Sequence, residues 1–162
     1  ERRENIFYMD ETVFSTGQVK PKIWYCAQSG PVLLPKKRVS FKAIAVAAAI
    51  DRQGRVVAQF IKEKSIDTEA FCSFLRKLKQ HTKRRKAVLL CDNLKVHRTR
   101  DVRELAARLK IEIVYNGTYC SEQMPIERLW AWSKLRFVRA CAKDAPYHDQ
   151  KRIHALVESI LL

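Results

Sequence analysis

The sequence is poor in the features that mark disulfide-rich, secreted or membrane-spanning proteins. Only four glycines occur among 162 residues, and no repeat or low-complexity segment is present. The five cysteines are scattered and form no CxxC pair, which argues against a disulfide framework or a zinc knuckle and favours a reducing compartment. No apolar run reaches the length of a membrane span, and the chain opens on charged residues without an initiator Met or a signal peptide. We therefore expect no membrane association, and we expect this chain to be a piece of a longer protein.

Acidic residues are also scarce relative to basic ones. The chain has 32 Lys plus Arg against 17 Asp plus Glu, which gives a net charge of +15 and a pI near 9.9. Apolar residues make up 47 %, which argues against disorder, and the length predicts one domain over residues 1–162. A basic domain that can form a core most often binds a polyanion. The composition fits a nuclease, chromatin or ribosomal protein better than a secreted enzyme for small neutral substrates.

The order of the apolar segments predicts an α/β fold. Early apolar runs predict strands at 6–9, 39–50 and 55–62, with a hairpin turn at 51–54 and a further short strand candidate at 24–26. Helical periodicity then alternates with apolar runs, predicting a helix capped by Asp67, a strand at 87–91, a helix over 102–109, a strand at 111–115, a helix opening at Pro125 and a last helix over 153–160. Three strands followed by helix–strand–helix–strand–helix is the order of a ribonuclease-H-like fold, in which helices flank a central mixed five-stranded sheet. The pattern alone leaves this fold as one of several mixed α/β options.

Three acidic residues stand where such a fold would bring them together. Asp10 and Asp92 each follow an apolar run, and we expect both at the carboxyl ends of strands, where open α/β sheets place ligand sites. Glu127 lies in the first turn of the helix that opens at Pro125. Clustered carboxylates repel one another unless a divalent cation neutralises them, and oxygen ligands favour Mg²⁺ or Mn²⁺ over zinc. A site with two such ions suits phosphoryl transfer.

Each of these acids also has an ordinary structural explanation. A lone Asp after a strand is more often a turn or cap residue, and a Glu in the first helical turn stabilises the helix dipole. The spacing of the acids is weakly specific by itself. Their joint context, two strand ends and then a helix start, favours the metal site.

Three segments resemble the signature blocks of DDE transposases of the Tc/mariner superfamily. They are Tyr8–Thr12 (YMDET), Cys91–His97 (CDNLKVH) and Tyr119–Trp130 (YCSEQMPIERLW), and 34 residues separate Asp92 from Glu127. The resemblance implies that Asp10, Asp92 and Glu127 form a catalytic triad that binds Mg²⁺ or Mn²⁺, with two ions. The third block departs from the family pattern in the loop before Glu127, at the positions Cys120, Ser121, Gln123 and Met124.

Further residues are candidates through the same blocks or through their charge. Asn93 and His97 match family positions near the active site; for His97 we favour helix capping or solvent contact over contact with DNA. Glu11 should point to the face of its strand opposite Asp10, and so is not expected to bind metal. Lys134 shares a helix face with Glu127 and is either a DNA contact or a solvated lysine. The basic run Lys36, Lys37 and Arg38 is a further candidate DNA-binding cluster.

The resemblance implies the catalytic domain of a DNA transposase. Such a domain hydrolyses phosphodiester bonds at transposon ends and joins the freed 3′-hydroxyl to target DNA, usually as a dimer or larger assembly. The family's N-terminal helix-turn-helix region is not among these residues. Two alternatives stay open: a domesticated, non-catalytic DNA-binding protein of the same fold, or another ribonuclease-H-like nuclease or integrase. The expected location is the nucleus in a eukaryote and otherwise the cytoplasm, at the nucleoid.

Overall fold

The computed structural model of the chain describes residues 5–18, 41–83, 85–117, 124–143 and 149–161. Five strands form one sheet in the order β3-β2-β1-β4-β5. The strands are β1 (Asn5–Phe14), β2 (Ile44–Ile50), β3 (Val56–Glu63), β4 (Ala87–Cys91) and β5 (Ile111–Tyr115). The helices of the described residues are α1 (Thr68–Thr82), α2 (Arg100–Leu109), α3 (Ile126–Lys143) and α4 (Gln150–Leu161), with short 3₁₀ turns η1 (Thr16–Gln18) and η3 (Lys95–Arg98).

The sheet is mixed, with β1 at its centre. β1, β2 and β3 pair antiparallel, whereas β4 pairs parallel to β1 and β5 parallel to β4. This confirms the predicted ribonuclease-H-like order. β2 begins at Ile44 rather than at 39, because its partner β3 ends opposite it at Glu63 and the chain turns away at Lys64 with a positive φ of 73°. The strand candidate at 24–26 lies outside the described residues.

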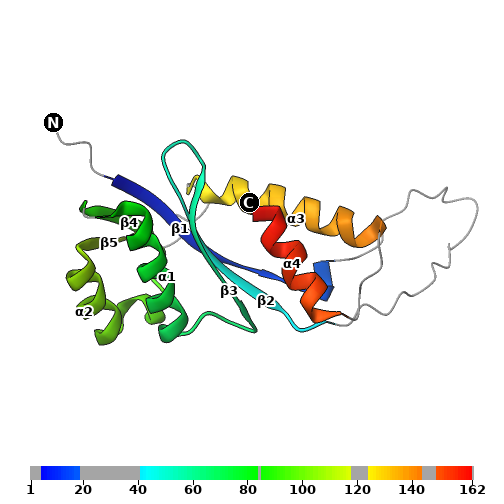
Figure 1. Cartoon of the computed structure of the whole chain (residues 1–162), viewed down its shortest axis with the longest axis horizontal. Helices are drawn as coiled ribbons and strands as arrows, with labels where there is room; N and C mark the ends of the chain where they lie inside the picture. The colour runs from blue at the N-terminus through cyan, green and yellow to red at the C-terminus, as the bar shows by residue number, and fades with distance from the viewer. Residues whose placement is uncertain (1–4, 19–40, 84, 118–123, 144–148, 162) are drawn as a thin grey trace, which may run out of the picture.

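Helices cover both faces of the sheet (Figure 1): α1 and α2 lie on one side, α3 and α4 on the other. All seven residues of β2 are buried, as expected for a strand covered on both faces. Along β1 the side chains alternate between the two layers. Phe7 and Met9 belong to the core under α1 and α2, while Tyr8 and Phe14 pack on the α3 and α4 side. This alternation determines which layer each polar residue of β1 faces.

The helix starts follow the expected local chemistry. Asp67 caps α1, its carboxylate accepting a hydrogen bond of 2.9 Å from the backbone N–H of Ala70. Pro125 immediately precedes α3, where a residue without an N–H leaves no orphan donor. Cys72, Cys91 and Cys141 are buried free thiols. Within the part of the chain that the structure describes, no helix is both long and apolar enough to cross a membrane.

Candidate active site

Asp10 lies in the middle of β1, so the expectation that the strand ends there is wrong. The strand continues because β2 stays paired with it, Asp10 itself lying opposite Ala48. On the other edge of β1, the last parallel pair with β4 joins Tyr8 to Leu90. Asp10 and Asp92 each stand two residues beyond that pair, which carries them to the same level of the sheet. Asp92 follows the end of β4, as predicted.

The Asp10 carboxylate points towards α3. Its Oδ2 accepts a hydrogen bond of 3.0 Å from Nε1 of Trp130, a residue only 2 % exposed. The pKa of Asp10 is raised from 3.8 to about 6, chiefly because burial disfavours the charged form. Hydrogen bonds from the Glu11 backbone and Trp130 lower the pKa, and the negative charges of Glu127 and Asp92 raise it. Thus the charges of the other two predicted triad acids both act on Asp10.

Glu127 reaches this site from the first turn of α3. Its backbone N–H bonds the carbonyl of Met124 at 3.1 Å, closing the turn in which Pro125 sits. Met124 replaces the capping Asn of the family pattern, and its side chain is buried in the core between the sheet and the α3 and α4 layer. This substitution therefore exchanges a cap for apolar packing, and Glu127 stays half-buried near Asp10. The other three departures in this block lie outside the described residues.

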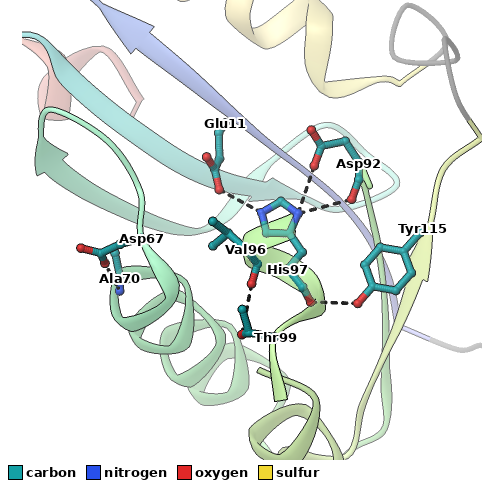
Figure 2. Close-up of polar contacts among 8 residues, drawn as sticks. All are labelled: Glu11, Asp67, Ala70, Asp92, Val96, His97, Thr99 and Tyr115. Carbon is teal, nitrogen blue, oxygen red and sulfur yellow. Dashed lines mark hydrogen bonds and ion pairs between the residues drawn. The ribbon is translucent and has the colours of Figure 1, made fainter. Parts of the chain in front are cut away.

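His97 occupies a position that the sequence did not suggest. It sits in η3, fully buried, with its ring between Glu11 and Asp92 (Figure 2). Nε2 lies 3.0 Å from Glu11 Oε1, and Nδ1 lies 3.0 Å from Asp92 Oδ1 and 3.3 Å from the Asp92 carbonyl oxygen. The ring stacks on Phe71 with centroids 4.2 Å apart. His97 is thus no helix cap and meets no solvent, and its burial does not support direct contact with DNA.

The surroundings of His97 favour its charged form. Burial alone would lower the pKa of the imidazole, but hydrogen bonds with Asp92, Cys91 and Glu11 outweigh burial and raise the pKa to about 12. Glu11 points to the α1 and α2 face, opposite Asp10, as predicted from the strand alternation. A buried imidazolium therefore bridges a carboxylate on β1 and one just beyond β4.

Comparison with known proteins assigns the family. Residues 5–154 match the family model of the DDE superfamily endonucleases. The chain belongs to this superfamily. The match confirms the resemblance to DDE transposases that the three sequence blocks predicted, and a search of the curated proteins finds no significant match.

Solved structures share the fold of this DDE domain. The Mos1 transposase paired-end complex with left transposon end matches with a TM-score of 0.66 and 20 % identity, over 97 % of this chain and 53 % of that chain. The Mos1 mariner paired-end complex with Mn gives 0.64 and 17 %, over 97 % and 54 %. The HTLV-2 integrase catalytic core domain in complex with magnesium gives 0.60 and 13 %, over 98 % and 83 %. This chain spans about half of the Mos1 transposase.

The chemistry of the DDE acids fits Mg²⁺ or Mn²⁺. Asp10, Asp92 and Glu127 offer carboxylate oxygens only, which suits these hard cations. The raised pKa of Asp10 shows that its charge is inadequately compensated by the protein alone. Among the described residues, however, no three His, Cys, Asp or Glu side chains lie close enough together to hold a metal ion. The three acids therefore match the cation in donor type only.

The remaining candidates of the DDE domain differ in placement. Asn93 follows Asp92 directly and is exposed, and Lys134 is half-buried on α3, two turns beyond Glu127. Trp132, also on α3, is 47 % exposed, and the Arg136 guanidinium lies 4.6 Å from the centre of its ring. Residues 36–38 lie outside the described residues.

Two residues that touch the acids were missed as site residues. Trp130 was not among the candidate site residues, although a buried indole N–H needs an acceptor and Glu127 lies one turn away. For Glu11, strand alternation predicted which face of the sheet the side chain points to, but not its partner. That partner, His97, could have been suspected because it lies in the second sequence block, just after β4.

Proposed function

We propose that this chain is the catalytic domain of a DNA transposase that cleaves phosphodiester bonds at transposon ends and transfers the freed strand to target DNA. The observation that carries the proposal is the arrangement of the acids. Asp10 and Asp92 share one level of neighbouring strands, and the charge of Glu127 acts on Asp10 from the start of α3. The shared fold with Mos1, solved with a transposon end, supports a DNA substrate.

In this proposal Asp10, Asp92 and Glu127 hold Mg²⁺ or Mn²⁺, two ions in all. When bound, such ions supply activation of the attacking oxygen and stabilisation of the leaving oxygen in phosphoryl transfer. The chain prepares the ligands. Trp130 holds Asp10 Oδ2 at 3.0 Å, and with a pKa of about 6 the Asp10 carboxyl is mostly ionised at neutral pH. The structures of Mos1 with Mn and of HTLV-2 integrase with magnesium support the choice of cation.

The basic surface would hold the DNA backbone. A net charge of +15 provides phosphate contacts without sequence preference. Lys134 lies on the helix that carries Glu127, Asn93 is exposed beside Asp92, and the basic run at 36–38 adds further charge. The chain would act as a dimer or larger assembly on DNA, and the solved paired-end complexes of Mos1 support an assembly at transposon ends.

The experiment is nicking of supercoiled plasmid in Mn²⁺. Asp92→Asn should lower the rate about 1,000-fold, since metal-ion stabilisation of the transition state is worth several kcal/mol. Asp101→Asn, the same substitution at an exposed position in the first turn of α2, is the matched control and should keep the wild-type rate. Fluorescence anisotropy should show that Asp92→Asn still binds DNA.

The outcomes separate the alternatives. Nicking that requires both Mn²⁺ and Asp92 supports the proposal. Cleavage confined to the RNA strand of RNA–DNA hybrids would assign a ribonuclease H instead. If the full-length protein also binds DNA but does not nick it, the protein is a domesticated, non-catalytic DNA-binding protein.

A further inference from the structure

We propose that His97 is a positioning residue for Asp92, and that Glu11 anchors it from β1. The inference rests on the proposed function, because it takes Asp92 to be a cation ligand. It concerns the network Glu11–His97–Asp92, which we name the cross-strand brace (Figure 2). The brace lies on the side of β1 opposite Asp10, away from the direction in which Asp10 meets Trp130.

Both nitrogens of His97 face acidic side chains, and Nδ1 also forms a hydrogen bond of 3.3 Å with the backbone carbonyl of Asp92. Nε2 lies 3.0 Å from Glu11 Oε1, and Nδ1 lies 3.0 Å from Asp92 Oδ1. These two contacts fix the ring at opposite ends, and the stack on Phe71, 28° from parallel, fixes its plane. The ring consequently has one orientation in which all of its polar atoms are satisfied.

The backbone of η3 is held as firmly as the ring. The Tyr115 hydroxyl donates a hydrogen bond of 2.8 Å to the His97 carbonyl, and the His97 N–H bonds the Leu94 carbonyl at 3.1 Å. One residue before His97, the Val96 carbonyl accepts a bond of 3.3 Å from the Thr99 hydroxyl. Hydrogen bonds from β5 and within the turn thus support the backbone that carries the imidazole beside Asp92.

Asp92 needs such support more than Asp10 does. It follows the last residue of β4, and its side chain is 40 % exposed, whereas Asp10 lies within a strand paired on one edge and bonded to Trp130. Oδ1 of Asp92 is buried 3.0 Å from Nδ1 of His97, so the second oxygen of this partly exposed side chain is the one available to a cation. Glu11 adjoins Asp10 on β1. The brace therefore links Asp92 to the same strand that carries Asp10.

A side chain that only fills space in the core is normally apolar, whereas His97 carries two polar ring nitrogens. The ring lies among apolar groups, where a polar or charged side chain is expensive unless it is fully paired. Groups that hydrogen-bond a metal-binding carboxylate typically affect metal affinity or activity by about 10- to 100-fold. The brace therefore predicts an effect on cation binding beyond any effect on folding.

Two amide substitutions separate the two ends of the imidazole. His97→Asn places an N–H near the position of Nδ1 and keeps the contact with Asp92. His97→Gln reaches towards Glu11 and loses the contact with Asp92. The two variants remove the same aromatic ring, so the difference between them reports the Asp92 contact.

Mn²⁺ binding is measured through the electron paramagnetic resonance signal of the free ion. The rate of plasmid nicking is measured in parallel as a function of Mn²⁺ concentration. His97→Gln should weaken Mn²⁺ binding about 10- to 100-fold, shifting nicking to higher Mn²⁺ with a smaller change at saturation. His97→Asn should retain most of the affinity. Equal Mn²⁺ affinity in His97→Gln, His97→Asn and the wild type would overturn the positioning role, as would equal losses in the two variants.

Asp92→Asn and a second pair of variants complete the test. If Asp92→Asn binds Mn²⁺ as tightly as the wild type, the proposed function fails and the inference with it; if only Asp92→Asn loses binding, the inference alone fails.

If either His97 variant loses its near-ultraviolet circular dichroism and so is not folded, two variants of Glu11 test the brace instead. Glu11→Gln keeps an oxygen towards Nε2 and should bind Mn²⁺ like the wild type, whereas Glu11→Ala should bind it more weakly; equal binding by these two overturns the brace.

Discussion

Asp10 and Asp92 lie at one level of neighbouring strands, yet the protein surrounds them in opposite ways. Asp10 accepts hydrogen bonds from the indole of Trp130 and from a backbone N–H, both neutral donors, and burial raises its pKa to about 6. Asp92 faces the buried, charged ring of His97. The negative charge of Asp10 is therefore poorly compensated, whereas that of Asp92 lies beside the positive charge of His97.

The difference separates two requirements of a carboxylate cation site, charge and orientation. Asp10 is oriented by its place inside β1, so the protein can leave its charge for a metal ion to neutralise. Asp92 stands beyond the end of its strand and is oriented by the brace. The two acids are supported from opposite faces of the sheet, because Trp130 comes from α3 on one face and His97, stacked on Phe71 of α1, lies on the other.

The largest effect that tests this contrast is on stability without metal. In EDTA at pH 7, Asp10→Asn should raise the free energy of unfolding by up to about 3 kcal/mol, because a pKa raised by about two units destabilises the ionised native state. Asp92→Asn should lower it by about 1 kcal/mol, because His97 exchanges a charged partner for a neutral one. Urea unfolding of both variants measures this, and shifts of the same sign would remove the contrast.

The pH dependence gives the sign of the Asp10 effect independently. Between pH 3.8 and about 6 the folded protein binds more protons at Asp10 than the unfolded chain does. Stability contributed by this group is therefore lost as the pH rises through that window. The advantage of Asp10→Asn over the wild type should vanish near pH 4. Addition of Mn²⁺ at pH 7 should raise the melting temperature of the wild type and leave that of Asp10→Asn nearly unchanged.

An intermediate effect is expected at the donor to Asp10. Trp130→Phe keeps an aromatic ring but loses the N–H, so the pKa of Asp10 should rise above about 6. The acid limb of the nicking rate should move to higher pH, and the unfolding free energy should fall by about 2 kcal/mol. Trp132→Phe, two residues along α3 on the exposed side, should leave the limb in place. An unmoved limb in Trp130→Phe would show that this bond does not tune Asp10.

The smallest effect concerns DNA affinity, where the two acids should not differ. Asp10→Asn and Asp92→Asn should both bind a DNA duplex as the wild type does in fluorescence anisotropy, since the basic surface supplies the contacts. All three should weaken steeply with salt, because three neutralised phosphates alone raise the Kd about 40-fold between 50 and 200 mM. Binding that is insensitive to salt would contradict an electrostatic footprint.

Much of the fold was readable from the chain, because its signals are local. The continuous apolar run of β4 and the caps and periodicity of α1 predict their elements closely. β1 extends past Asp10 for a non-local reason: β2 stays paired with it although Glu11 and Thr12 are charged and polar. β2 is shorter than its apolar run because β3 ends first.

The acidic residues of the site could be predicted from the sequence, but the residues that hydrogen-bond or contact them could not. Strand alternation placed Asp10 and Glu11 on opposite faces, which the structure confirms. Nothing periodic places a residue of a 3₁₀ turn in the core, so the burial of His97 followed only from the three-dimensional packing of η3 on α1. That packing brings together groups 86 residues apart in the chain.

In the proposed function, Asp10 and Asp92 together hold a divalent cation at the junction of β1 and β4. Crystals of the protein grown with Mn²⁺ and measured at the manganese absorption edge would reveal this ion. We expect an anomalous peak in contact with both carboxylates, with Glu127 turned towards it. Anomalous peaks only elsewhere, or none with Mn²⁺ at millimolar concentration, would contradict it.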